Sequence, residues 1–253
     1  MLPQPFREFH NAVLVVTAPG LDERQKSARR QLGDGNFEFV FGINKNATSK
    51  DDLAARGIYD EQRAIEIDRR HKSMTLGHIC CSFGHREAYR RIIENRFERT
   101  LIFEDDVTVF DVEETAIREI LAAAPKDGDL IYWGWSGVER KPWFGSLKQY
   151  LYNIQHALGL LKLDHKMIGN LYPRGFNQHF LIAGRLFGTY AYSVSLEGAR
   201  ILLDRHTPIV QNADNALMYA SLKGDLHAYM SRRKLFGEHS QGVAGSIESL
   251  VQS

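Results

Sequence analysis

Three consecutive acidic residues, Glu104, Asp105 and Asp106, are the side chains of this sequence best placed to do chemistry. They directly follow Thr100–Phe103, a largely apolar run that predicts a buried strand. Adjacent carboxylates repel one another unless a cation or hydrogen-bond donors neutralise them. The carboxyl end of a parallel strand is where open α/β sheets bind ligands. Carboxylate oxygens suit Mg²⁺ or Mn²⁺, so the cluster predicts a divalent metal that can also bridge a diphosphate.

The same acids have plainer interpretations. The three acids could instead lie in a solvated turn, or at a helix N-terminus, whose dipole favours negative charge. Side chains alternate along a strand, so a strand continuing through the cluster would point Glu104 and Asp106 one way and Asp105 the other.

The segments that must position the cluster alternate between strand and helix patterns. Short β-branched or aromatic runs predict further strands at Ala12–Val16, Phe37–Phe41, Leu130–Trp133, Phe180–Ile182 and Thr189–Val194. Helices are expected at Leu21–Leu32 (ending at Gly33), Lys50–Arg56, Glu61–Arg69, Met74–Phe97, Glu113–Ala124, Ser195–Leu203 (with Ser195 as N-cap) and Asp214–Leu222. The strand–helix–strand rhythm predicts an α/β fold, with a mostly parallel central sheet flanked by helices.

Residues 142–175 depart from that rhythm. They contain a predicted helix whose apolar residues fall on one stripe: Leu147, Tyr150, Leu151, Ile154, Leu158 and Leu161. We expect the stripe to pack on the core; a lid, an acceptor platform or a membrane-surface contact are the alternatives. The nearby Trp133, Trp135 and Trp143 could stack on sugar rings, although core packing is the commoner use of tryptophan.

Composition narrows the class of protein. The 253 residues are 43% hydrophobic and carry a net charge of +1, which is ordinary for a globular chain and disfavours nucleic-acid binding. The adjacent Cys80 and Cys81 cannot close a disulfide loop. No signal peptide or bilayer-spanning segment is evident, which favours a cytoplasmic location. The basic patches at 69–72 and 232–234 could touch anionic lipid, although such patches are more often solvated surface.

Several blocks together resemble glycosyltransferase family 25, which includes lipopolysaccharide glycosyltransferases and collagen galactosyltransferases. The matching positions are Val13–Thr17 with Asp22 and Arg24, the run Gly77–His85, the triplet Ala88-Tyr89-Arg90, the acids Glu104-Asp105-Asp106, Gly188-Thr189 through Ala199, and Asp214 with Leu217. The sequence departs from the family pattern at His78, Cys80, Gly84 and Tyr190, which leaves the donor sugar open.

The resemblance implies a GT-A-type, Rossmann-like fold in a single domain over residues 1–253. Residues 1–135 would be the nucleotide-sugar-binding half and residues 136–253 the acceptor-binding half. The donor would be a UDP-sugar, with galactose or glucose expected, and the acceptor a glycan or lipid-linked glycan such as lipopolysaccharide. Synthesis would take place in the cytoplasm, with possible peripheral contact at the inner membrane.

The resemblance also assigns roles to residues. Mn²⁺ or Mg²⁺ would be held by Asp106, Glu104 and His239, with Asp106 the first choice. Asp214 would be the general base of an inverting reaction, whereas a retaining reaction would not require a base in this form. Donor contacts would come from Arg24, His85, Arg90, Glu104, Asp105, Gly188 and Thr189. Asp214 could equally be a helix N-cap, and His239 an ordinary surface residue.

Other functions compete with this hypothesis. The same acids would serve another metal-dependent enzyme acting on nucleotides or phosphates, although the sequence shows no basic phosphate cradle. A catalytically inactive carbohydrate-binding homologue is a further alternative, which the intact acids disfavour. A zinc site built from His71, His78 and His85 lacks the tight ligand spacing of structural zinc modules.

Overall fold

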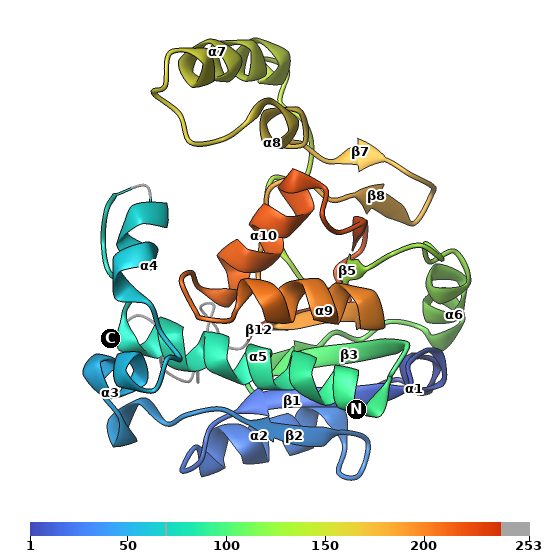
Figure 1. Ribbon diagram of the computed structural model, residues 1–253. Coiled ribbons are helices and arrows are strands. Elements are labelled where there is room, and N and C mark those ends of the chain that lie inside the picture. Colours follow the sequence, from blue (N-terminus) through green and yellow to red (C-terminus); the bar gives the residue numbers. More distant parts are fainter. Residues whose placement is uncertain (69, 239–253) are drawn as a thin grey trace.

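A single eight-stranded sheet forms the centre of the computed structural model, which describes residues 1–68 and 70–238 (Figure 1). Its spatial order is β2 (Glu38–Phe41), β1 (Ala12–Thr17), β3 (Arg99–Glu104), β10 (Ala191–Ser195), β5 (Leu130–Tyr132), β11 (Ala228–Ser231), β8 (Phe180–Ile182) and β7 (Arg174–Gly175). The pairings make β10 and β8 antiparallel to their neighbours, and the other strands share one direction. The predicted α/β fold with a mostly parallel sheet is confirmed.

Two small antiparallel pairs accompany the main sheet. The first joins β12 (Phe236–Glu238) to β4 (Val107–Val109), and the second joins β6 (Ser136–Gly137) to β9 (Leu186–Phe187). Because β4 begins immediately after the acidic cluster, the first pair brings the end of the described chain beside it.

Alternation along the strands distributes the core between the two faces of the sheet. In β1, Leu14 and Val16 belong to the cluster covered by α5 (Leu76–Asn95), α9 (Leu196–Arg205) and α10 (Ala213–Lys223). Val13 and Val15 face the other way, toward α1 (Gln4–Phe9), α2 (Asp22–Leu32) and α6 (Glu114–Ala122). Burial on both faces explains why the strand is a continuous apolar run.

Local sequence signals set several helix ends. Gly33 follows the last residue of α2 at φ 83°, and the Ser195 side chain accepts a hydrogen bond from the Gly198 N–H at the start of α9, as predicted. Asp214 is not the N-cap of α10: the Asn212 side chain caps that helix by accepting from the Asn215 N–H. This frees the Asp214 carboxylate for other partners.

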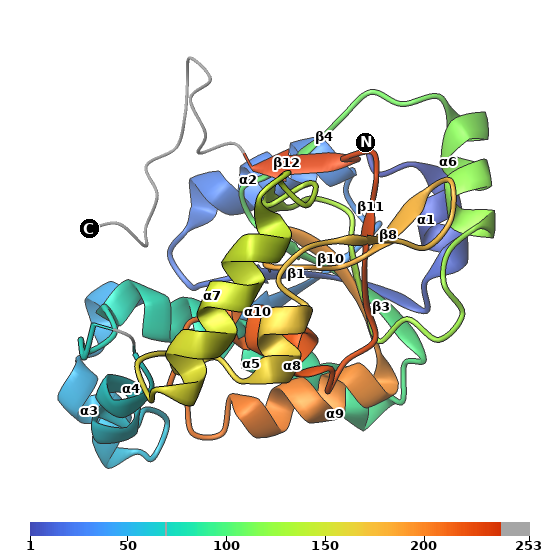
Figure 2. The same cartoon turned by 90° about the horizontal axis from the view of Figure 1, so that it is seen from above.

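A lobe formed by α7 (Gly145–Ala157) and α8 (His165–Gly169) stands away from the main body (Figures 1 and 2). Packing of the α7 stripe on the core was the wrong expectation, because Leu147, Tyr150 and Leu158 are 60, 64 and 67% exposed. The inner side of α7 carries polar groups that hold α8: Gln149 donates to the Ile168 carbonyl (2.8 Å). The apolar stripe is therefore left on the outer side.

The remaining described helices lie on the loop between β2 and α5. They are the 3₁₀ turn η1 (Lys45–Ala47), α3 (Lys50–Ala55) and α4 (Glu61–Ile67). No helix among the described residues combines the length and apolar character needed to cross a membrane.

Candidate active site

Glu104 is the last residue of β3 and lies at the carboxyl edge of the sheet, paired with Val16 of β1. Alternation after Phe103 turns its side chain toward the face covered by α5. There, Glu104 Oε1 lies 3.2 Å from Nε2 of His85 and accepts a short hydrogen bond from the Thr189 hydroxyl. Burial opposes ionisation of Glu104, but these bonds and the charge of Arg24 outweigh it and lower its pKa. Glu104 is the one member of the cluster whose pKa is lowered.

Asp105 and Asp106 lie beyond the strand, in the turn that leads to β4. Arg24 of α2 binds both: its Nε donates to Asp105 Oδ1 and its Nη2 lies near Asp106 Oδ2, each at 2.7 Å. Thr17, at the end of β1, donates to the second oxygen of Asp105 (2.6 Å). The expectation that Asp105 and Asp106 point opposite ways is wrong, because the strand ends at Glu104 and the turn gathers both aspartates around one guanidinium.

Asp106 is the least satisfied of the three acids. It is 6% exposed, and its Oδ1 has no hydrogen-bond partner among the described residues. Burial, followed by the charge of Glu104, raises the pKa of Asp106 to about 7. Asp105, which has better partners, also has a raised pKa, chiefly because it is buried. A single arginine thus faces three carboxylates, which leaves room for a further cation.

Asp214 lies in the first turn of α10 and joins the cluster through the segment before β10. Its Oδ1 accepts from the Gly188 N–H at 2.8 Å and lies 3.3 Å from the Thr189 hydroxyl. Gly188 has a φ of 107°, a conformation that favours glycine. Since Thr189 also bonds Glu104, a single hydroxyl separates the two carboxylates. Burial, followed by the charge of Glu104, raises the pKa of Asp214.

His85 connects the acids to a buried phenol pair. Its Nδ1 lies 2.8 Å from the Tyr192 hydroxyl, which lies 2.9 Å from the Tyr89 hydroxyl. An ionised Glu104 can only accept, so Nε2 of His85 donates to it, and in the neutral imidazole Nδ1 then accepts from Tyr192. Tyr89 then donates to Tyr192, and every member of the chain is satisfied. The network fixes the imidazole orientation that Glu104 needs.

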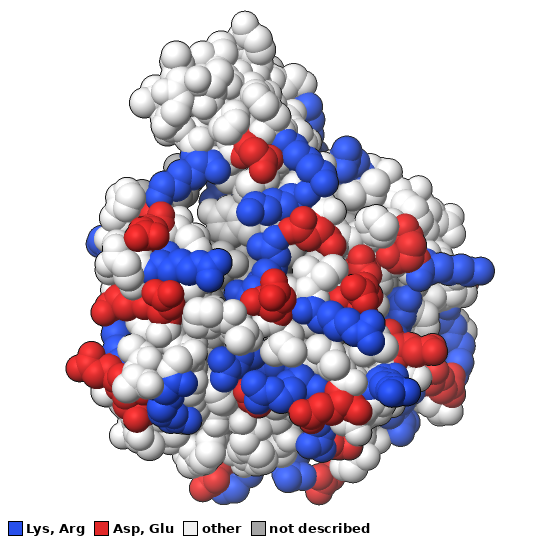
Figure 3. All heavy atoms as spheres, in the orientation of Figure 1, with Lys and Arg blue, Asp and Glu red and all other residues white. Residues whose placement is uncertain are grey.

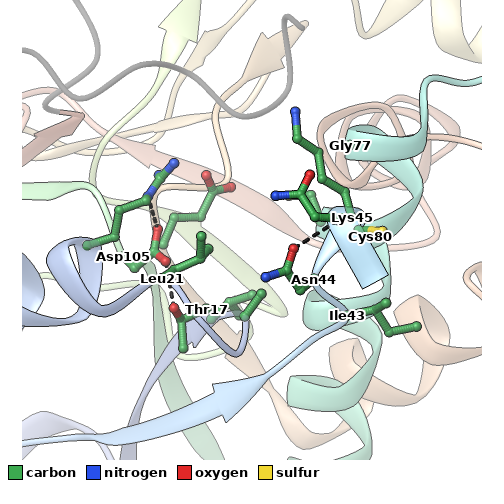
Figure 4. A pocket seen from close by; sticks show the side chains of 14 residues that line it. Thr17, Leu21, Ile43, Asn44, Lys45, Gly77, Cys80 and Asp105 are labelled. Carbon is green, nitrogen blue, oxygen red and sulfur yellow. Dashed lines mark hydrogen bonds and ion pairs between the residues drawn. The ribbon is translucent and has the colours of Figure 1, made fainter. Parts of the chain in front are cut away.

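A pocket opens beside the cluster, at the carboxyl ends of β1 and β2 (Figure 4). Thr17, Leu21 and Asp105 lie on one side of it, and Asn44, Lys45 and Cys80 lie on the other. Arg24 and Glu104 also line it. The walls combine apolar surface with amide, ammonium and carboxylate groups, a composition typical of small-molecule sites.

Several of these pocket residues were not predicted from the sequence. Thr17 and the η1 segment with Asn44 and Lys45 were missed, as was Tyr192 behind the pocket. The sequence does contain a signal for η1, because this segment follows the second parallel strand. The carboxyl ends of adjacent parallel strands share one edge of the sheet, which would place η1 beside the acids. Tyr192 gave no such signal, because its role depends on contact with a helix far away in the sequence.

Not every predicted site residue lies at the cluster. The Arg90 guanidinium is half exposed, pairs with Glu87 on its own helix and does not line the pocket. His239 falls outside the described residues. The three-histidine zinc site is not formed: the group of candidate metal donors within 4.8 Å of one another contains Cys81, His85 and Glu104, without His71 or His78. Burial raises the pKa of the Cys81 thiol well above its ordinary value, which makes it a weak ligand.

Comparison with known families gives a match over most of the chain. The family described as glycosyltransferase family 25 (LPS biosynthesis protein) matches residues 20–217. This span includes Arg24, His85, the three acids, Gly188, Thr189 and Asp214, which the fold brings together. A search of curated proteins finds no match.

Proposed function

The chain belongs to glycosyltransferase family 25, and from that premise we propose that it transfers a hexose, galactose or glucose, from a UDP-sugar to a glycan acceptor such as lipopolysaccharide. The reaction inverts the anomeric carbon and depends on a divalent metal, on a GT-A-type fold. The donor lies in the pocket between Thr17, Asn44 and Asp105, at the carboxyl edge of the parallel strands. Transfer takes place in the cytoplasm, and a lipid-linked acceptor is reached from the membrane surface.

The observation that carries this proposal is the unpartnered Oδ1 of Asp106. A buried carboxylate oxygen with no donor, next to two further acids, fits a site for Mn²⁺ or Mg²⁺. Asp106 and Glu104 would hold the ion, with His239 as the proposed third ligand. The sequence neighbour of His239, Glu238, pairs with Val107, directly after Asp106. When bound, the ion stabilises the negative charge of the departing nucleoside diphosphate. Arg24 keeps Asp105 and Asp106 in place, and Asp105 borders the donor.

Asp214 is the proposed general base for the acceptor hydroxyl. Its raised pKa makes it a better proton acceptor than an ordinary aspartate. The Gly188 N–H fixes one carboxylate oxygen (2.8 Å), which sets the direction of the other. His85, Gly188 and Thr189 support the acids from behind, whereas Arg90 would reach a phosphate only after leaving Glu87.

A donor screen tests this function. Hydrolysis of UDP-galactose, UDP-glucose and other nucleotide sugars is measured with Mn²⁺, with Mg²⁺ and with a chelator. We expect UDP-hexose turnover that requires the metal, and a higher melting temperature when UDP and Mn²⁺ are added together. Turnover of simple phosphates or other nucleotides in place of UDP-sugars would support a different metal-dependent enzyme. Binding of glycan with no turnover of any donor would support an inactive homologue.

The metal assignment has its own variant test. Asp106→Ala should lower kcat/KM at least about 100-fold and abolish the Mn²⁺-dependent rise in melting temperature, because the central ligand is lost. Asp111→Asn is the matched control: it removes an exposed acid a few residues further along and should leave both quantities unchanged. Full activity of Asp106→Ala would exclude Asp106 as a ligand.

A further inference from the structure

The outer side of the α7–α8 lobe is an exposed apolar surface. Trp143 is 95% exposed, and Leu147, Tyr150 and Leu158 on the same lobe are each at least 60% exposed. In Figure 3 the lobe is almost entirely white, in contrast to the charged body below it. A contiguous apolar surface of this kind on a soluble fold marks a site of contact with another molecule or a membrane.

Basic side chains outnumber acidic ones around this surface. Residues 141–163 contain three lysines, Lys141, Lys148 and Lys162, and no acidic residue. Below the lobe runs a groove of about 900 Å³ whose basic residues outnumber its acids, Glu66, Asp204 and Asp225. The basic residues lining it are Arg63, Lys162, Arg200, Arg205 and Lys223. Figure 3 shows several Lys and Arg side chains directly below the white lobe, with fewer Asp and Glu side chains among them.

The body of the protein holds the lobe in place from its inner side. Met167 and Ile168 of α8 are buried against Met218 and Leu222 of α10. Lys162 Nζ donates to the Glu66 carbonyl of α4 at 2.7 Å. The apolar surface is therefore presented at a fixed position relative to the basic groove.

We propose that α7 docks this protein on an anionic lipid bilayer. The helix lies in the plane of the interface, with Trp143, Leu147 and Leu158 in the headgroup–acyl boundary and the basic residues against lipid phosphates. An apolar surface flanked by lysines and free of acids matches the chemistry of an anionic membrane surface. A second copy of this chain would offer the same lysines and the same absence of acids, so it lacks complementary charge. The docking surface is separate from the donor pocket and does not depend on the proposed transferase activity.

Tryptophan fluorescence tests the proposal directly, because Trp133 and Trp135 are buried and Trp143 is exposed. The protein is mixed with vesicles of phosphatidylglycerol and phosphatidylcholine, or of phosphatidylcholine alone. We expect emission to shift to shorter wavelength with the anionic vesicles, and quenching by lipids brominated on the acyl chain. Trp143→Phe should still sediment with the vesicles but lose the shift. High salt should weaken binding, because the lipid charges are then screened.

Two variants locate the surface. The double variant Leu147→Ser/Leu158→Ser should weaken sedimentation with anionic vesicles about tenfold or more, because apolar area drives insertion. Phe41→Ser removes an exposed aromatic side chain from β2, at the opposite end of the molecule, and should bind as the wild type does (Figure 1). Lys141→Glu/Lys148→Glu, which reverses the charge of two exposed lysines beside the surface, should weaken binding to anionic vesicles by a similar factor.

The results also separate this inference from the proposed function. Asp106→Ala should bind vesicles as the wild type does, and Leu147→Ser/Leu158→Ser should keep metal-dependent hydrolysis of the donor. Absence of vesicle binding by the wild type would overturn the inference. So would self-association in ultracentrifugation that the double leucine variant abolishes, since α7 would then join two copies of the chain.

Discussion

Asp105 and Asp106 are adjacent and share Arg24, yet their surroundings differ. Asp105 accepts from Thr17 and from the Arg24 Nε, whereas Asp106 keeps one oxygen without a partner among the described residues. Glu104 differs again, because His85 and Thr189 stabilise its charge. The three acids thus divide into a Glu104 with a lowered pKa, an Asp105 whose two oxygens both have partners, and an Asp106 whose Oδ1 has none among the described residues.

Asp106 makes the stability of the metal-free protein depend on pH. Its folded pKa, about 7, lies above the ordinary value near 4, so the folded state holds an extra proton between these pH values. The contribution of this carboxyl to stability is therefore present below pH 4 and is lost as pH rises through 7. Asp106→Asn should be more stable than the wild type at pH 8, by no more than about 4 kcal/mol, and the difference should shrink toward pH 4.

Thermal unfolding with a chelator present, at pH values from 4 to 8, measures this difference. Added Mn²⁺ should stabilise the wild type at pH 8 and leave Asp106→Asn unchanged. A difference between the two proteins that stays constant with pH would show that the Asp106 carboxyl is already satisfied in the folded state.

His85 is a positioning residue for Glu104. Replacing it by Leu removes the donor to Glu104 and should lower kcat about 10- to 100-fold, the usual effect of losing a group that orients a ligand. The pKa of Glu104 should rise, because a hydrogen bond that lowers it is lost, so the acidic limb of the kcat/KM profile should move to higher pH. His85→Gln keeps an N–H donor and should recover part of the activity. A Leu variant with lower activity but an unmoved pH profile would point to a packing role instead.

At the scale of elements, Gly84 allows α5 to approach the sheet closely. A Cβ at this position would lie 2.5 Å from Cγ1 of Val16, and the Cα of Gly42 lies beside it. This close approach gives a physical reason for a glycine at position 84. The close approach also brings the next residue, His85, within reach of Glu104.

Gly84→Ala should therefore destabilise the protein, although alanine favours helices by up to about 1 kcal/mol. Overpacking against Val16 costs about 1–3 kcal/mol, so we expect a net loss of about 1 kcal/mol or more, seen as a lower melting temperature. Gly169→Ala is the matched control: this glycine also lies in a helix, but its Cβ would meet nothing within 4 Å. Equal stability of the two variants would mean that α5 can move away from β1 at little cost.

The elements also show what can be predicted from sequence. The strand at β3 and the helix at α2 carry local signals, an apolar run and a terminal Gly, and both were predicted close to their observed bounds. The strands β4, β11 and β12 were missed, because each is three or four residues long and is defined by a partner distant in sequence. The three acids were found because they are adjacent in the sequence. Thr17 and Tyr192 were missed because only the fold brings them to the site.

At the scale of the whole molecule, the described structure has two separate surfaces with different chemistry. The pocket beside the acids lies at the carboxyl edge of β1 and β2, and the apolar lobe stands at the far side of α10 from the sheet (Figure 1). The stripe prediction holds for the part on α7, where Leu147, Tyr150 and Ile154 are all exposed, whereas Leu161 follows the helix and packs in the cluster of α8 and α10. Periodicity does not show whether a stripe faces the core or the solvent. In this structure Gln149, on the inner side of α7, bonds the carbonyls of α8, and the apolar stripe therefore faces the solvent.

The position of β10 has a consequence for how this chain is made. β10 lies between β3 and β5, pairing Tyr192 with Ile102 on one side and with Tyr132 on the other. A ribosome therefore releases both flanking strands well before the strand that joins them. Until Ala191–Ser195 emerges, the nascent chain exposes the unpaired edges of two strongly apolar strands, which is a hazard for aggregation. The protein should depend on chaperones during synthesis more than a sheet assembled in sequence order would.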